Sequence, residues 1–171
     1  MLFLVGEPGP AWTVSIGEEA RVRRGPCFVC AFVVGDPAYR REHELIHEDA
    51  DHIAFLVRWA TLPGKVLVAP KAHVEHAVRD LDEPAYVRLM LPVRRVAPTV
   101  EAVVEPERTY LLSPGSKQGN AHLHWHVAGL PPGVPYEQQH HALMSENGVP
   151  AVALDEEVAL AARLRRAVSS L

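Results

Sequence analysis

The stretch that decides how this chain folds is His122-Leu123-His124-Trp125-His126-Val127, in which histidines alternate with apolar residues. Alternate side chains of a β-strand lie on the same face, so residues 122–128 are predicted to form a strand with one histidine face and one apolar face. We expect the apolar face to pack against the hydrophobic core. The histidine face predicts chemistry, because neighbouring imidazoles pack poorly and resist being protonated together.

The residues alone leave three interpretations of the histidine face open. A chain with 10 histidines can carry a polar surface strand by chance. Imidazole is a common metal ligand, so three of them on one face can also form a metal site. In the third interpretation, a neutral imidazole attacks phosphorus and forms a covalent intermediate, while a neighbouring histidine gives a proton to the leaving group.

The rest of the sequence predicts an α+β fold, an antiparallel sheet with a long helical segment packed on it. Apolar runs bounded by turn residues predict further strands over residues 44–48, 53–59, 65–69 and 108–112. A helical pattern begins at Asp82 and continues to Val104, and Pro92 and Pro98 within it predict a kink or two helices. Residues 136–145 and 155–169 predict two shorter helices, the second capped by Asp155. This order of elements favours an antiparallel sheet over repeated βαβ units.

The composition is typical of a globular protein with one core. The chain has 171 residues, of which 48% are apolar, and a net charge of −4. This charge argues against a nucleic-acid polymer or a membrane surface as partner. No apolar run approaches the roughly 20 residues of a membrane span, and the five apolar residues at the N-terminus are too few for a signal peptide. We therefore expect a cytoplasmic protein whose 2 cysteines form no structural disulfide.

Four segments, in order along the chain, resemble the histidine-triad (HIT) superfamily. Residues 122–128 resemble its His-x-His-x-His motif with apolar residues between and after the histidines. Residues 53–56 and 64–73 resemble its apolar strand and its Gly-x-Leu-Val-x-Pro-x-x-His segment. Residues 27–30 resemble its N-terminal Cys-x-x-Cys. The resemblance covers residues 26–135 and implies the HIT-like fold.

The resemblance implies a nucleotidyl hydrolase that acts on a dinucleoside polyphosphate, a phosphoramidate or a similar nucleotide. His124 would attack the α-phosphorus and become a nucleotidyl-histidine, and His126 would contact the phosphate and assist the leaving group. The residues that it implies for substrate binding are Ser113, Gln118, Gly119, Asn120 and Phe55. A nucleotidyltransferase or phosphorylase with an acceptor other than water is one alternative, and a slow nucleotide sensor is another.

The sequence departs from the family pattern beside the triad and in the apolar strand. Gly119-Asn120-Ala121 directly precede His122, whereas relatives place Gly-Gln four or five residues before their first histidine. Composition alone also allows residues 113–120 to be a plain turn. Relatives often carry an acidic residue that holds the ribose hydroxyls, and none stands near Val57-Arg58. The preferred base and the mode of ribose recognition therefore stay open.

The spacing of Cys27 and Cys30 allows both thiolates to hold one zinc ion. Zinc-bearing relatives complete such a site with two histidines, and the resemblance assigns these to His73 and His122. Four protein ligands make a closed site, which is structural rather than catalytic. The alternatives are that both cysteines are small buried side chains, and that His76 replaces His73.

The predicted organisation has three parts. Residues 1–25 form an N-terminal extension, residues 26–135 the HIT-like catalytic domain, and residues 136–171 a C-terminal helical extension packed on that domain. The resemblance also implies a homodimer whose active strands lie near the interface, with a nucleotide as substrate.

Overall fold

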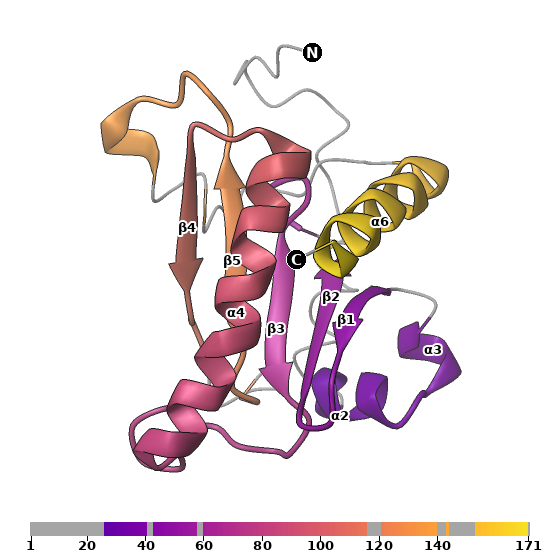
Figure 1. Ribbon diagram of the computed structural model, residues 1–171, viewed down its shortest axis with the longest axis vertical. Coiled ribbons are helices and arrows are strands. Elements are labelled where there is room, and N and C mark those ends of the chain that lie inside the picture. Colours follow the sequence, from indigo (N-terminus) through magenta and orange to yellow (C-terminus); the bar gives the residue numbers. More distant parts are fainter. Residues whose placement is uncertain are drawn as a thin grey trace.

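The computed structural model describes residues 26–40, 43–57, 60–115, 121–139, 143 and 153–170, with the side chains of residues 40 and 43 excepted. Within these ranges the strands form one antiparallel sheet of five, in the order β1-β2-β3-β5-β4 (Figure 1). The strands are β1 (His43–Glu48), β2 (His52–Val57), β3 (Val66–Pro70), β4 (Arg108–Leu112) and β5 (Trp125–Leu130). The predicted α+β fold with an antiparallel sheet is confirmed.

Helix α4 (Glu83–Val104) packs across one face of the sheet (Figure 1). The helix begins after Asp82, the predicted N-cap. Asp82 Oδ1 accepts a hydrogen bond of 2.8 Å from the backbone N–H of Ala85. Pro92 and Pro98 lie inside this one helix of 22 residues, so of the two predicted alternatives two separate helices are excluded, and a kink stays a prediction. A proline inside a helix destabilises it by about 3 kcal/mol, and burial of each valine on the inner face stabilises the fold by about 1.5–3 kcal/mol.

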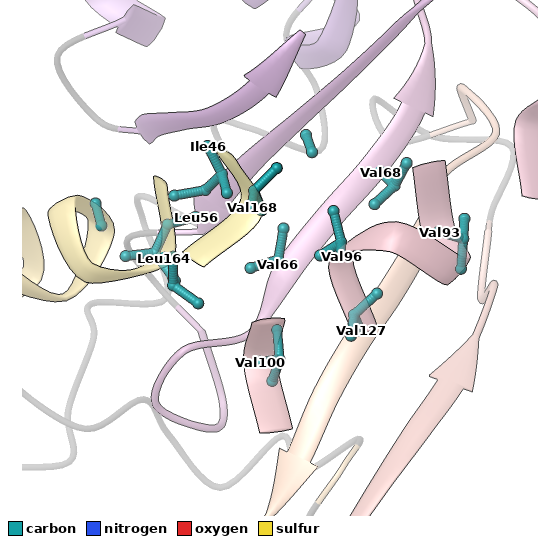
Figure 2. Packing of buried hydrophobic residues seen from close by; sticks show 12 residues of the cluster. Ile46, Leu56, Val66, Val68, Val93, Val96, Val100, Val127, Leu164 and Val168 are labelled. Carbon is teal, nitrogen blue, oxygen red and sulfur yellow. The ribbon is translucent and has the colours of Figure 1, made fainter. Parts of the chain in front are cut away.

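The main core lies between the sheet, α4 and the C-terminal helix α6 (Leu154–Ser169). Figure 2 shows its branched side chains interlocking, with Leu164 and Val168 of α6 against Ile46 and Leu56 of the sheet. The predicted C-terminal helix is therefore present and joins the core. Its cap is Ala153, which makes no side-chain hydrogen bond, and Asp155 lies inside the first turn instead of capping it.

The opposite face of the sheet is covered in part by the short helix α2 (Phe28–Val33), which is followed by α3 (Pro37–Arg40). Phe28 and Phe32 of α2 pack on Phe55 of β2, with ring centroids 6.2 and 4.6 Å apart. The face covered by α2 also carries the histidines described below, and we call it the catalytic face. Helix α2 brings the N-terminal cysteines to this face.

The histidine stretch begins its strand later than predicted, because β5 starts at Trp125 rather than at His122. Only from Trp125 onward does it have strand partners, pairing Trp125 with Val68 of β3 and His126 with Leu112 of β4. Strands β3 and β4 both end near Trp125, so residues 122–124 form hydrogen bonds with other segments. The N–H of Leu123, for example, donates to the carbonyl of Val74 at 2.7 Å. His122 and His124 are thus placed by loops as well as by the strand.

Beyond β5 the chain forms a 3-10 helix, η2 (Tyr136–Gln138), within the region where a longer helix was predicted. Residues 140–142 and 144–152 lie outside the described part, as do residues 1–25 of the predicted N-terminal extension. No helix within the described ranges is both long enough and apolar enough to cross a membrane.

Candidate active site and metal centre

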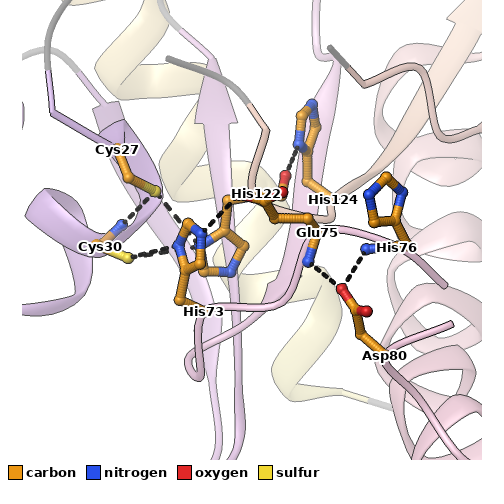
Figure 3. Close-up of polar contacts among 8 residues, drawn as sticks. All are labelled: Cys27, Cys30, His73, Glu75, His76, Asp80, His122 and His124. Atoms are coloured by element: carbon orange, nitrogen blue, oxygen red, sulfur yellow. Dashed lines mark hydrogen bonds and ion pairs between the residues drawn. The ribbon is translucent and has the colours of Figure 1, made fainter. Parts of the chain in front are cut away.

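His124 is held in one tautomer at the edge of the catalytic face. Its side chain is buried, and its Nδ1–H donates to the carbonyl oxygen of His122 at 2.6 Å (Figure 3). A neutral imidazole carries only one N–H, so the lone pair lies on Nε2. The Phe28 ring packs edge-on against the imidazole, with centroids 5.9 Å apart. This arrangement leaves Nε2 as the nitrogen whose lone pair is available to an electrophile.

Burial lowers the pKa of His124 below its usual range, and the positive charge of Lys65 lowers it further, although the hydrogen bond to His122 raises it. The imidazole is therefore neutral at pH 7, which is the form that can attack an electrophile. Lys65 was not among the residues selected from the sequence, yet its charge acts on the pKa of the nucleophile.

His126 lies next to His124, with ring centroids 4.9 Å apart and the planes inclined by 58°. Burial, followed by the charges of Lys65 and His124, lowers the pKa of His126 to about 2. Its Nδ1 is buried and has no hydrogen-bond partner among the described residues. A second neutral imidazole thus stands beside His124, where its N–H can donate a hydrogen bond to a bound anion.

The predicted substrate-binding residues have different surroundings. Ser113 Oγ donates to the carbonyl oxygen of His124 at 2.7 Å, so this hydroxyl supports the backbone of His124. Phe55 has 0% exposure and packs beneath Phe28 instead of lining a cavity. Gln118, Gly119 and Asn120 lie outside the described residues. Contact of any of these residues with substrate stays a prediction.

A hollow of about 1190 Å³ opens beside His124. Its walls come from the turn at residues 75–79, from Tyr86 of α4, and from residues 113–115 and 121–125. The turn is closed by Asp80 Oδ2, which accepts from the backbone N–H groups of Glu75 and His76 at 3.0 and 2.9 Å (Figure 3). Ligand pockets of a few hundred to about 1,000 Å³ are typical, so the hollow can accommodate a nucleotide.

Four potential metal ligands converge behind His124, as Figure 3 shows. The ligand atoms of Cys27, Cys30, His73 and His122 all lie within 4.8 Å of one another. His122 Nδ1 lies 3.4 and 3.5 Å from the sulfurs of Cys27 and Cys30, and His73 Nδ1 lies 3.3 Å from that of Cys30. His76, the rival for His73, is not part of the group.

These distances fit a tetrahedral zinc ion. Zinc–sulfur and zinc–nitrogen bonds of about 2.3 and 2.0 Å place the two ligand atoms about 3.5 Å apart in a tetrahedron. Both histidines have their other nitrogen engaged: His122 Nε2–H donates to the Pro70 carbonyl at 2.8 Å, and His73 Nε2 contacts Glu75 Oε1 at 3.4 Å. Such partners fix the tautomer and direct both Nδ1 lone pairs toward the thiols. The group can hold a metal ion with four protein ligands, as a structural zinc site requires.

The Cys30 thiol is held in its protonated form at neutral pH. Burial and the neighbouring Cys27 raise the pKa of Cys30 to about 11. A cation held between the thiols reverses this effect, because it stabilises the thiolate and displaces its proton. Metal binding at Cys30 would therefore release a proton.

The comparisons with known proteins agree with the fold and with the triad. Residues 40–132 match the family described as the HIT domain, which is more than half of the chain. The chain therefore belongs to the HIT, or histidine-triad, family. Cys27 and Cys30 precede the matched segment, and the fold brings them to it.

Solved structures provide the same result for the fold. The chain is similar to a hypothetical histidine triad nucleotide-binding protein from Sulfolobus tokodaii strain7, with a TM-score of 0.66 and 23% identity over 85% of this chain and 93% of that one. It is also similar to a Zn-bound histidine triad family protein from Mycobacterium smegmatis, with a TM-score of 0.61 and 23% identity over 84% of this chain and 94% of that one. No curated protein sequence matches the chain.

Proposed function

We propose that this protein is a nucleotidyl hydrolase that cleaves at the α-phosphate of a nucleotide through a covalent intermediate on His124. HIT proteins are generally nucleotide hydrolases or transferases. The observation that carries the proposal is the hydrogen bond of 2.6 Å from His124 Nδ1 to the His122 carbonyl. It leaves Nε2 of a buried, neutral imidazole as the nucleophile, with a second neutral imidazole at its side.

The reaction has two displacements at phosphorus. In the first, His124 Nε2 forms a bond to the α-phosphorus, the bond from phosphorus to the leaving group breaks, and the leaving group departs with the bonding electron pair while the N–H of His126 donates a hydrogen bond to it. In the second, water attacks the phosphorus and releases a proton to solvent, which neutralises the leaving group; the N–P bond breaks, its electron pair returns to Nε2, and a nucleoside monophosphate leaves. Splitting one displacement into two lowers the barrier of each.

Cys27, Cys30, His73 and His122 are the residues that would hold a zinc ion, and the ion would supply a structural cross-link, because protein ligands would take all four of its positions. The carbonyl of His122 accepts the hydrogen bond that orients His124, so such a cross-link would stabilise the hydrogen-bond partner of the proposed nucleophile.

The test is turnover of a substrate panel by the wild type and by His124→Ala. Diadenosine polyphosphates, adenosine phosphoramidate and nucleoside diphosphate sugars are incubated with each protein, and nucleoside monophosphate is measured. We expect release by the wild type on at least one substrate, and a loss of at least 10³-fold in the variant. Zinc content and thermal unfolding serve as controls, since His124 is not in the ligand group. Equal activity of the two proteins would exclude His124 as nucleophile.

The same assay separates the alternative functions. Added inorganic phosphate converts the product to a nucleoside diphosphate if the enzyme is a phosphorylase, and leaves a monophosphate if it is a hydrolase. Tight binding of a monophosphate with turnover below about one per hour would instead indicate a nucleotide sensor.

We also propose a homodimer. Within the described sheet, β4 is an edge strand, and its Leu111 is 43% exposed, so the strand can pair with a second copy. Sedimentation analysis at micromolar concentration tests this. The expected cytoplasmic location, and the expectation that neither a nucleic-acid polymer nor a membrane is a partner, stay predictions.

A further inference from the structure

The group of four potential metal ligands lies partly at the surface. Cys27 and Cys30 are both half-buried, and the side chain of His73 is 43% exposed. His122 is the buried member of the group. Oxidation of a cysteine depends on thiolate character and on access from solvent. Small oxidants can therefore reach this pair of thiols once zinc binding has made them thiolates.

Cys27 and Cys30 also stand close enough to react with each other. Cys27 caps α2, and its Sγ accepts from the backbone N–H of Cys30 at 3.4 Å, so the sulfur is turned toward the first helical turn. The two sulfurs are at most 4.8 Å apart. Cys-x-x-Cys pairs are the usual reactive pairs of thiol–disulfide exchange. The chain has 2 cysteines in all, so within one chain each can form a disulfide only with the other.

The same group touches two walls of the hollow beside His124. His122 is a lining residue, and its carbonyl accepts the hydrogen bond from His124 Nδ1. Glu75 lines the hollow from the turn at residues 75–79, and its Oε1 lies 3.4 Å from His73 Nε2. Cys30 Sγ contacts the Nδ1 atoms of His73 and His122 at 3.3 and 3.5 Å (Figure 3). A chemical change at the thiols therefore acts on both walls.

We propose that Cys27 and Cys30 form a redox switch: peroxide joins their sulfurs in a disulfide, the group loses its hold on zinc, and both walls of the hollow loosen. This inference rests on the proposed function, because it assigns a regulation to the same site. The disulfide is transient, in agreement with the sequence-based expectation that the cysteines form no structural disulfide.

The oxidation takes place in two steps. One thiolate attacks hydrogen peroxide, the O–O bond breaks, and a sulfenic acid and hydroxide form. The second thiolate then attacks the sulfenic sulfur, the S–O bond breaks, and the S–S bond forms with release of a second hydroxide. The sulfurs lose two electrons, the peroxide gains them, and two protons from solvent convert both hydroxides to water. The disulfide has no negative charge, so only His73 and His122 remain as ligands, too few for a structural zinc site.

The experiment treats the full-length, zinc-loaded wild type with a molar excess of hydrogen peroxide. Released zinc is measured with a chromogenic chelator, free thiols by titration after unfolding, and the mass of the intact chain by mass spectrometry. We expect zinc release together with loss of both thiols and of two hydrogens in mass. Calorimetry is expected to show a rise in Kd for nucleoside monophosphates of about fivefold or more, which corresponds to one lost hydrogen bond. Reductant and added zinc are expected to restore the original Kd.

Two controls separate the switch from general oxidative damage. Cys30→Ser cannot form the disulfide, so peroxide is expected to leave the Kd of this variant unchanged. Reduced wild type stripped of zinc by a chelator is expected to show the raised Kd without oxidation, because its histidines are released in the same way. If Cys30→Ser does not fold, the reversal of the wild-type Kd by reductant and zinc decides instead.

The outcomes separate this inference from the proposed function. Zinc and thiols that resist peroxide overturn the inference, and so does zinc release with an unchanged Kd. A gain of oxygen in mass that reductant does not reverse, or a disulfide between two chains, overturns it as well. Reduced protein that binds a monophosphate without turning over any substrate refutes the hydrolase, whereas zinc release and the Kd ratio still decide on the switch. Absence of all nucleotide binding refutes both.

Discussion

His122 takes part in two sites through three different atoms. Its Nδ1 faces the thiols of Cys27 and Cys30, its Nε2–H donates to the Pro70 carbonyl, and its own carbonyl accepts from His124. The ring and the backbone of one residue therefore connect the four potential metal ligands to His124, the proposed nucleophile. Replacing His122 would disturb both sites at once, so Cys30 and His124 are the better positions for separating their roles.

Replacing Ser113 tests whether its hydroxyl supports the backbone of His124 or binds the substrate directly. Its hydroxyl donates to the His124 carbonyl at 2.7 Å, so Ser113→Ala removes one neutral hydrogen bond, with a net value of about 1 kcal/mol. We expect kcat to fall about three- to tenfold with KM little changed, because the nucleophile is held less firmly. Steady-state kinetics measures both constants. A raised KM at unchanged kcat would favour the sequence-based prediction that Ser113 binds substrate.

At the scale of elements, the turn between β2 and β3 is fitted closely to the end of α4. Gly64 has φ of +72°, and a Cβ at this position would lie 2.5 Å from Val104 Cγ2. Gly64→Ala is therefore expected to reduce the free energy of unfolding by about 2 kcal/mol or more, through backbone strain and the displaced valine. Urea unfolding measures the loss.

Gly133→Ala is the matched control for Gly64→Ala. Gly133 also has a positive φ, of +86°, but nothing lies within 4 Å of the added Cβ. We expect only the strain component here, about 1 kcal/mol. Equal losses in the two variants would contradict a steric contact between this turn and α4.

The strands were predictable because their apolar runs are bounded by strong turn residues. The run at residues 28–33 was not assigned, because a run of six apolar residues is compatible with a strand or a helix. Cys27 at its N-cap, whose sulfur accepts from the Cys30 N–H, shows that α2 is a helix. The start of β5 was missed because it depends on where β3 and β4 end, and the alternation of residues cannot show this.

The candidate site was predictable wherever its residues share a motif. His124, His126 and the four metal ligands stand in such motifs, and the structure brings them together. Lys65 and Phe28 were not recognised, because their contacts depend on strand register and on how α2 docks. The only available signal was a lysine at the entry to the otherwise apolar run that becomes β3.

At the scale of the whole molecule, a metal ion held by the four potential ligands would attach α2 to the sheet. Its ligands come from α2 and its cap, from the segment after β3, and from the segment before β5. We expect one zinc ion per chain by elemental analysis. Chelation or Cys30→Ser is expected to lower the melting temperature by more than 5 °C, since binding free energy contributes to folding.

A variant outside the ligand set tests whether this effect is specific. His76→Ala, at the residue considered as a rival for His73, is expected to keep the zinc ion and the melting temperature. Purified wild-type protein without zinc, or with a melting temperature that chelators do not alter, would contradict a structural metal site.

The position of β5 has a consequence for how the protein is made. A ribosome delivers the chain from its N-terminus, so β4 is complete before β5, yet β5 lies between β3 and β4 in the sheet. Strand β4 therefore has no place to pair until residues 125–130 have emerged. The fourth metal ligand, His122, arrives in the same interval. Until then the nascent chain has an open sheet edge at β3, and the thiols of Cys27 and Cys30 lack the fourth member of their group.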